Sequence, residues 1–168
     1  MKTQFMKGIL FIFSFLFFTL SYADSLANSQ QSSFLAGKML VVDMDNDGKV
    51  SKDTVMGGTD LLIGTINNDI AHKAAAFNVE TINDVKTLSQ YDLNHDGTIE
   101  QNELAKTNLV LIRFSPDRSI TIIPLALSNI KEIHYQGGLT QKNKINQPLN
   151  VWLTSVDGKK FQTYYLNF

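Results

Sequence analysis

The stretch DLNHDGTIEQNE, residues 92–103, is the most informative part of the sequence. Side chains that carry oxygen stand at alternate positions, at Asp92, Asn94 and Asp96. Gly97 then permits a sharp turn that a residue with a Cβ would resist, and Glu103 can supply two oxygens at once. Calcium takes about 6–8 oxygen ligands at about 2.3–2.6 Å, so this spacing predicts a calcium site.

The same spacing resembles the EF-hand calcium loop, with Asp92 at position 1 and Glu103 at position 12. In that loop position 7 offers its backbone carbonyl, position 8 is an apolar anchor, and position 9 binds directly or through water. The predicted ligands are therefore Asp92, Asn94, Asp96, Thr98 (through its carbonyl), Glu100 and Glu103, with Ile99 as the anchor. The alternative is an acidic turn without metal.

A second stretch, DMDNDGKVSKDT at 43–54, repeats the first half of this pattern. The oxygens at its positions 1, 3, 5, 7 and 9 belong to Asp43, Asp45, Asp47, Lys49 (through its carbonyl) and Ser51. Position 12 is Thr54, which offers no carboxylate, and the nearest acid is Asp53 at position 11. Asp53, Asp60, a carbonyl or water could complete the shell, and a calcium-free turn is the alternative. We expect the loop at 92–103 to bind more tightly.

Composition narrows the classes of function. The formal net charge is −1, with no basic stripe along the chain, so we expect no nucleic-acid partner. The chain has no cysteine, which excludes disulfides, zinc–thiolate sites and a cysteine nucleophile. A bound metal is then a plausible substitute for covalent cross-links.

The N-terminus has the pattern of a secretory signal peptide. Lys2 and Lys7 form a positive region, the apolar run at 8–20 is too short for a membrane span of about 20 residues, and Ser-Tyr-Ala at 21–23 is a small-x-small cleavage site. We expect export to the periplasm or the medium, with no stable membrane insertion after cleavage. An uncleaved N-terminal anchor is the alternative.

The elements after residue 23 predict an α+β fold with short helices in the middle and a small antiparallel β-rich part at the end. Apolar residues at four-residue spacing predict a helix over 62–77, and a second stripe predicts one over 82–91. The predicted divisions are a signal peptide (1–23), a flexible N-terminus (24–33), an EF-hand-like calcium-binding region (34–108) and the β-rich part packed on it (109–168).

The order of these segments resembles a paired DxNxDG calcium-binding region of secreted bacterial proteins of the RTX and haemolysin type. The segments that carry the resemblance are MLVVDMDNDGKVSKDTVMGG (39–58), LSQYDLNHDGTIEQNE (88–103), LVLIRF (109–114) and VDGKKFQTYYLNF (156–168). The glycine-rich nonapeptide repeats of that class are missing, so the chain looks like a stand-alone relative. The resemblance implies calcium ligands in both loops and does not imply a catalytic activity.

The sequence therefore predicts an exported calcium-binding protein that is not an enzyme and in which calcium is mainly a structural staple. The sequence contains no GxSxG, HExxH, P-loop or GxGxxG pattern, and we assign no catalytic residue. The alternative function is a calcium-dependent surface adhesin or partner-binding module, whose protein partner the sequence does not identify.

Cleavage after Ala23 has a direct test. We expect the exported protein to begin at Asp24, because the apolar run is short and ends in small residues. Mass spectrometry of the protein from the periplasm or the medium would measure this N-terminus. A full-length species retained in the membrane would contradict the assignment.

Overall fold

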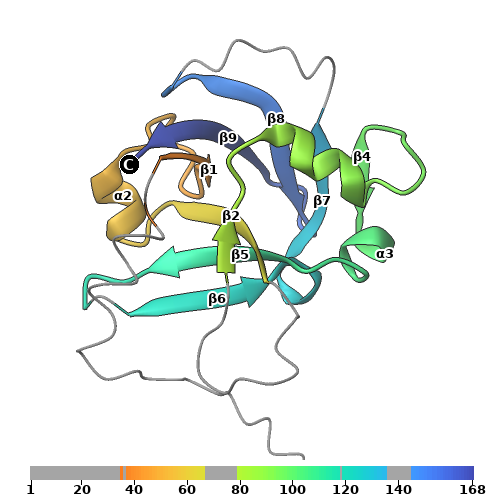
Figure 1. Cartoon of the computed structure of the whole chain (residues 1–168), viewed down its shortest axis with the longest axis horizontal. Coiled ribbons are helices and arrows are strands. Elements are labelled where there is room, and N and C mark those ends of the chain that lie inside the picture. The colour runs from red at the N-terminus through yellow and green to blue at the C-terminus, as the bar shows by residue number, and fades with distance from the viewer. Residues whose placement is uncertain (1–34, 36, 67–78, 118, 136–144) are drawn as a thin grey trace, which may run out of the picture.

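The structure is a computed structural model that describes residues 35, 37–66, 79–117, 119–135 and 145–168. These residues form one nine-stranded sheet in the order β4-β7-β8-β9-β1-β2-β5-β6, with β3 paired to β2. The sheet curls strongly (Figure 1). In chain order the strands are β1 (Lys38–Val42), β2 (Leu61–Ile66), β3 (Val79–Thr81), β4 (Thr98–Glu100), β5 (Leu109–Phe114), β6 (Ile120–Pro124), β7 (Ile130–Tyr135), β8 (Pro148–Ser155) and β9 (Lys160–Asn167).

The helices in the described residues are short. They are α2 (Lys52–Met56), α3 (Gln101–Leu104) and the 3₁₀ helices η1 (Val85–Tyr91) and η2 (Leu125–Leu127). The predicted α+β class is therefore wrong, because the structure is mostly antiparallel β. Strands from 34–108 and from 109–168 pair within the same sheet, β1 with β9 and β2 with β5.

Strand β1 is buried on both faces of the sheet. Successive side chains of a strand point to opposite faces, and here Leu40 and Val42 enter one hydrophobic core while Met39 and Val41 enter another. All four side chains are fully buried. We call the core that contains Leu40 the first core and the core that contains Met39 the second core. A strand buried on both faces has no polar alternation, which accounts for the continuous apolar run.

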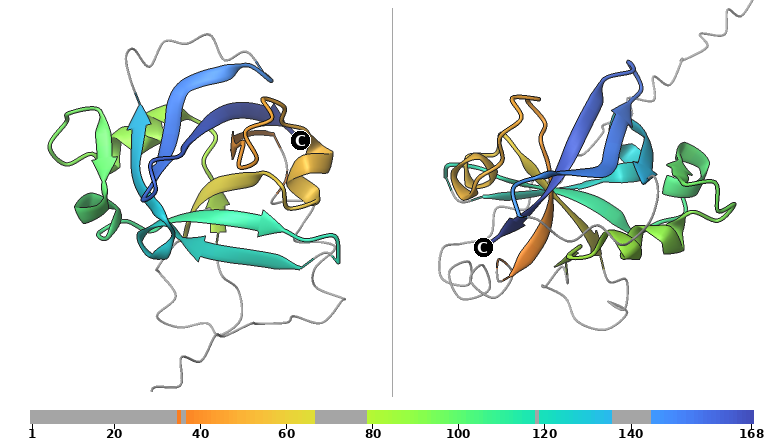
Figure 2. Two further views of the ribbon diagram at one scale, coloured as in Figure 1. Left: turned by 180° about the vertical axis from the view of Figure 1, so that it is seen from behind. Right: turned by 90° about the horizontal axis from the view of Figure 1, so that it is seen from above.

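Each loop attaches its short helix to a different core. Ile99 and Leu104, from the loop at 92–103 and from α3, pack in the first core. Val50 and Val55, from the loop at 43–54 and from α2, pack in the second core. The two loops accordingly lie on opposite sides of the molecule (Figure 2).

The predicted helix over 62–77 is wrong where the structure describes it. Residues 61–66 form β2, which pairs with β1 and β3 on one side and with β5 on the other. The pattern misled because residues four apart, such as Leu62 and Ile66, share a face in a strand as well as in a helix. Residues 67–78 of this prediction lie outside the described residues.

The helix predicted over 82–91 is shorter and tighter than expected. It begins at Val85, after Asp84 has capped it by accepting a hydrogen bond from the Lys86 backbone N–H at 3.0 Å, and it is a 3₁₀ helix. The predicted strands in the β-rich C-terminal part are present, and Asp157-Gly158 connects β8 to β9, with φ of 82° at Gly158.

The predicted signal peptide and flexible N-terminus, 1–33, lie outside the described residues. Within the part of the chain that the structure covers, no helix has the length and apolar character needed to cross a membrane.

Gly64 permits a close approach of backbone at the centre of β2. A Cβ on this residue would lie 2.6 Å from the Glu80 carbonyl oxygen and 2.7 Å from the Ile112 Cδ1. Only glycine lets β3 and the β5 side chain come this near.

Gly64→Ala should therefore destabilise the fold. Overpacking costs about 1–3 kcal/mol, and roughly 2–4 °C of Tm are lost per kcal/mol in a domain of this size. Thermal unfolding followed by circular dichroism would measure the loss. Gly158→Ala is the comparison, because it adds left-handed strain with no atom within 4 Å of the new Cβ. Wild-type melting of Gly64→Ala would contradict the β2–β3 packing.

Candidate metal sites

Loop 1 (Asp43–Thr54) and loop 2 (Asp92–Glu103) have the same backbone conformation at their turns. Position 4 is left-handed in both, with φ of 59° at Asn46 and at His95. Position 6 is also left-handed, with φ of 76° at Gly48 and 88° at Gly97. Asparagine and histidine tolerate this region better than most residues, and glycine enters it freely.

Three backbone N–H groups donate to side chains inside each loop, at matching positions. The N–H of position 6 donates to the carboxylate of position 1, that of position 5 to the side chain of position 3, and that of position 7 to position 5. In loop 1 the donor–acceptor pairs are Gly48 to Asp43 (2.9 Å), Asp47 to Asp45 (3.2 Å) and Lys49 to Asp47 (2.7 Å). In loop 2 they are Gly97 to Asp92 (2.9 Å), Asp96 to Asn94 (3.1 Å) and Thr98 to Asp96 (2.8 Å).

Glu103 closes loop 2. Its Oε1 accepts a hydrogen bond from the Leu93 backbone N–H at 2.8 Å, and its Oε2 accepts from the Glu100 backbone N–H at 3.0 Å. The side chain is buried, although it carries a carboxyl group. The carboxylate at position 12 thus lies against the start of the loop, while the side chain of Glu100 at position 9 is exposed.

Asp92 of loop 2 is held from outside the loop by Tyr135 of β7. The Tyr135 hydroxyl donates to Asp92 Oδ2. Burial alone would raise the pKa of Asp92, but the hydrogen bonds from Tyr135 and from backbone N–H groups, such as that of Gly97, outweigh burial and lower it. Burial and the hydrogen bond to the negative Asp92 raise the pKa of Tyr135. Asp92 is therefore kept ionised, as a metal ligand must be.

Loop 1 ends differently, because Thr54 replaces the glutamate. Thr54 Oγ1 accepts from the Ser51 backbone N–H at 3.0 Å, and Ser51 Oγ accepts from the Thr54 backbone N–H at 3.1 Å. The pair forms a capping box at the start of α2. The Ser51 side chain, a predicted ligand, is thus engaged as a helix cap.

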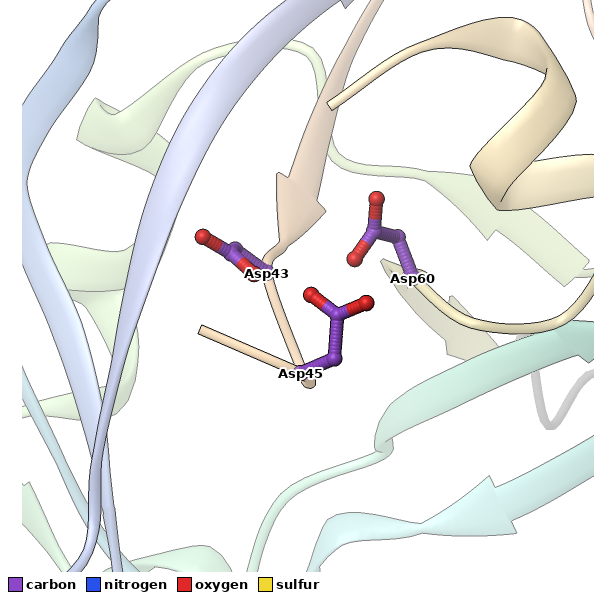
Figure 3. A group of neighbouring side chains, drawn as sticks. All are labelled: Asp43, Asp45 and Asp60. Atoms are coloured by element: carbon purple, nitrogen blue, oxygen red, sulfur yellow. The ribbon is translucent and has the colours of Figure 1, made fainter. Parts of the chain in front are cut away.

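Three carboxylates converge beside loop 1. Asp43, Asp45 and Asp60 each offer one oxygen, and these oxygens lie within 4.8 Å of one another (Figure 3). It is the only such group of three in the described ranges, and neither Asp47 nor the carboxylates of loop 2 belong to it. Two oxygens bound to one calcium at about 2.3–2.6 Å lie at most about 5 Å apart. The all-oxygen group therefore fits a hard cation such as calcium.

The environment of this group disfavours its negative charge. Burial raises the pKa of Asp43, and the neighbouring Asp45 raises it further, although a hydrogen bond from Gly48 opposes them. Burial likewise raises the pKa of Asp60, and the charges of Asp43 and Asp45 add to the effect. A cation in their midst would remove this penalty.

Two residues of these sites were not among the predicted ligands. Asp60 was one of several open alternatives, and its signal in the sequence is the Gly57-Gly58 pair that ends α2 just before it. No sequence pattern indicates the role of Tyr135, because its contact with loop 2 depends on the pairing of β4 with β7. The predicted carbonyl ligands Lys49 and Thr98 stand at matching places in their loops, and all the assigned ligands stay predictions.

The comparisons with known proteins agree with loop 2. A family model described as EF hand matches residues 85–109, which include η1, loop 2, β4 and α3. No curated protein and no solved structure matches the chain. The resemblance to the RTX and haemolysin type is not confirmed and stays a prediction. The family match supports an EF-hand-like, calcium-binding character for residues 85–109, and the group of Asp43, Asp45 and Asp60 has the geometry to hold a metal ion.

Proposed function

We propose that this chain is an exported protein that binds calcium through loops 1 and 2, and that calcium acts as a structural staple rather than as a switch. The observation that carries the proposal is the closure of loop 2. There Asp92 and Glu103 are 1% and 4% exposed, and Glu103 accepts a hydrogen bond from Leu93, the residue next to Asp92. Export rests on the N-terminal sequence pattern.

The attachments of loop 2 support a structural role for calcium. Strand β4, which begins at loop position 7, pairs with β7 through Thr98–His134 and Ile99–Ile133. On either side of the loop, Leu88 of η1 and Leu104 of α3 enter the first core. Calcium held by the loop would keep both helices and β4 in place over the first core. The apolar residues beneath them would then stay covered.

The calcium concentration that an exported protein meets is consistent with an ion that stays bound. Extracellular EF-hand modules bind calcium with Kd of about 10⁻⁴–10⁻³ M, close to the concentration outside cells. An ion bound only to the native state adds RT ln(1 + [L]/Kd), which is about 1.4 kcal/mol at ten times Kd and about 2.7 kcal/mol at a hundred times Kd. Without cysteine, the chain has no disulfide to supply a comparable stabilisation.

Calcium titration with Glu103→Gln tests this function. We expect wild-type protein to bind calcium in isothermal titration calorimetry and to lose several degrees of Tm in chelator, at roughly 2–4 °C per kcal/mol. Glu103→Gln should weaken the tighter binding event by more than about tenfold, because it removes a bidentate ligand. Glu80→Gln on β3 makes the same charge change on an exposed side chain outside both loops and should leave binding unchanged.

The outcomes separate the candidate roles. No calcium binding by the wild-type protein would refute the proposed function. Binding with identical melting curves in calcium and in chelator would refute the staple and favour a calcium-dependent adhesin or partner-binding module.

Tyr135→Phe tests the brace between β7 and loop 2. The substitution removes the hydroxyl that donates to Asp92. Groups that orient metal ligands typically change affinity by about 10–100-fold when they are removed, so we expect the tighter event to weaken within that range. Tyr91→Phe is the matched control, since its hydroxyl donates to Asn108 at 3.1 Å and to neither loop. Equal affinities of the two variants would contradict the brace.

A further inference from the structure

We propose that loop 1 holds a second calcium ion and that Asp60, from outside the loop, is the carboxylate that closes this site. The inference rests on the proposed calcium-binding function and names the ligand that Thr54 does not supply. Asp60 lies six residues beyond Thr54 and directly before β2.

The reason lies in two of the three backbone hydrogen bonds that Glu103 accepts in loop 2. One of its oxygens accepts from the backbone N–H of position 2, Leu93, and the other from that of position 9, Glu100. Both contacts fix the carboxylate of position 12 at the mouth of the loop. A residue that replaces this carboxylate should accept from at least one of the same two positions.

In loop 1 these two contacts are divided between two residues. Thr54 accepts from the position-9 N–H of Ser51 at 3.0 Å. Asp60 Oδ1 accepts from the position-2 N–H of Met44 at 3.3 Å. Asp60 therefore holds the same relation to the start of loop 1 as Glu103 holds to the start of loop 2.

Asp60 also lies close to Asp43, just beyond the paired ends of β1 and β2. Val42 pairs with Leu61 in the antiparallel register of these strands, and Asp43 and Asp60 are the residues next to this last pair. They are 1% and 0% exposed. Like charges close to each other are destabilising, and buried charges need a partner of opposite sign.

The buried oxygens of Asp43 and Asp60 that lack a hydrogen bond indicate that the missing partner is a cation. Neither Asp43 Oδ1 nor Asp60 Oδ2 has a hydrogen-bond partner among the residues that the structure covers. Buried polar atoms are rarely left in this state. The carboxylates of Asp43, Asp45 and Asp60 gather around one space (Figure 3), and Asp45 is exposed, so a cation can reach them from solvent.

The turn after α2 places Asp60, rather than Asp53, beside the other carboxylates of the site. Gly58 has φ of 78°, and a Cβ there would lie 2.2 Å from the Phe114 carbonyl oxygen, so the turn is pressed against the end of β5. The N–H groups of Thr59 and Asp60 both donate to the Thr54 carbonyl, at 3.0 and 3.2 Å. Asp53 is exposed on α2 and does not belong to the carboxylate group.

Calorimetric titration with calcium in a Glu103→Gln background isolates the first site. We expect two binding events in the wild-type protein and one in Glu103→Gln. Adding Asp60→Asn should weaken the remaining event by more than about tenfold, because it removes a charged ligand. Adding Asp53→Asn instead is the matched control and should leave that event unchanged.

Melting curves show whether Asp60 acts through calcium or only through the fold. Asparagine keeps an oxygen for the Met44 N–H and removes the charge that lies close to Asp43. We expect Asp60→Asn to melt no lower than wild type in chelator and to gain less Tm from calcium. An equal loss of Tm with and without calcium, together with unchanged binding, would overturn the proposal.

The failures of the two proposals are distinguishable. A single wild-type event that disappears in Glu103→Gln would overturn the second site and leave the calcium function of loop 2 intact. Loss of the remaining event with Asp53→Asn rather than with Asp60→Asn would also overturn it. A wild-type protein that binds no calcium would refute the proposed function itself.

Discussion

The double-sided burial of β1 and β2 is the constraint on which the rest of the structure depends. Both strands send side chains into both cores, so the sheet must be covered on each face. No long helix in the described residues supplies that cover. Instead loop 1 with α2 covers the second core and loop 2 with η1 and α3 covers the first. Each loop contributes its apolar position 8, Val50 or Ile99, as the point of attachment.

This arrangement has an electrostatic cost. The turns that tie the short helices to the sheet are built from aspartates, whose side chains accept hydrogen bonds from the backbone of the loop. The first residue of each loop, Asp43 or Asp92, lies where an element ends and is almost completely buried. A buried carboxylate needs hydrogen bonds or a cation. The fold therefore needs tight turns, and these turns are built from acidic residues. The buried carboxylates of these turns need a positive charge nearby.

The two loops meet the electrostatic requirement to different degrees. Asp92 gains the Tyr135 hydroxyl in addition to its backbone donors, and the net effect lowers its pKa. Asp43 has no described hydroxyl donor and lies close to Asp60, and its pKa is raised. Without an ion, the buried carboxylates of loop 1 are therefore less well compensated than Asp92 of loop 2. The number of ligands within each loop favours tighter calcium binding by loop 2. The relief of the unfavourable burial of carboxylates favours loop 1, so the two effects on affinity oppose each other.

The local parts of this molecule could be predicted from the sequence, and the long-range parts could not. Glycine at position 6, oxygen at positions 1, 3 and 5, and Asp157-Gly158 between two strands are short-range signals, and the turns form where these signals stand. The class of fold was mistaken because Leu62 and Ile66 fit a helix and a strand equally well. The pairing of β2 with β5, which decides between the two, depends on residues more than forty positions away.

The same distinction explains why Asp60 stayed one alternative among several. The spacing rule for position 12 assumes that a helix follows the loop and holds the position-12 side chain beside the other ligands. Here α2 ends at Met56, and the Gly57-Gly58 turn sends the chain back toward the loop before β2 begins. By position in the sequence Asp53 is the nearer acid, but by strand register Asp60 is the neighbour of Asp43. When a helix is cut this short, the strand that follows it determines which side chain closes the site.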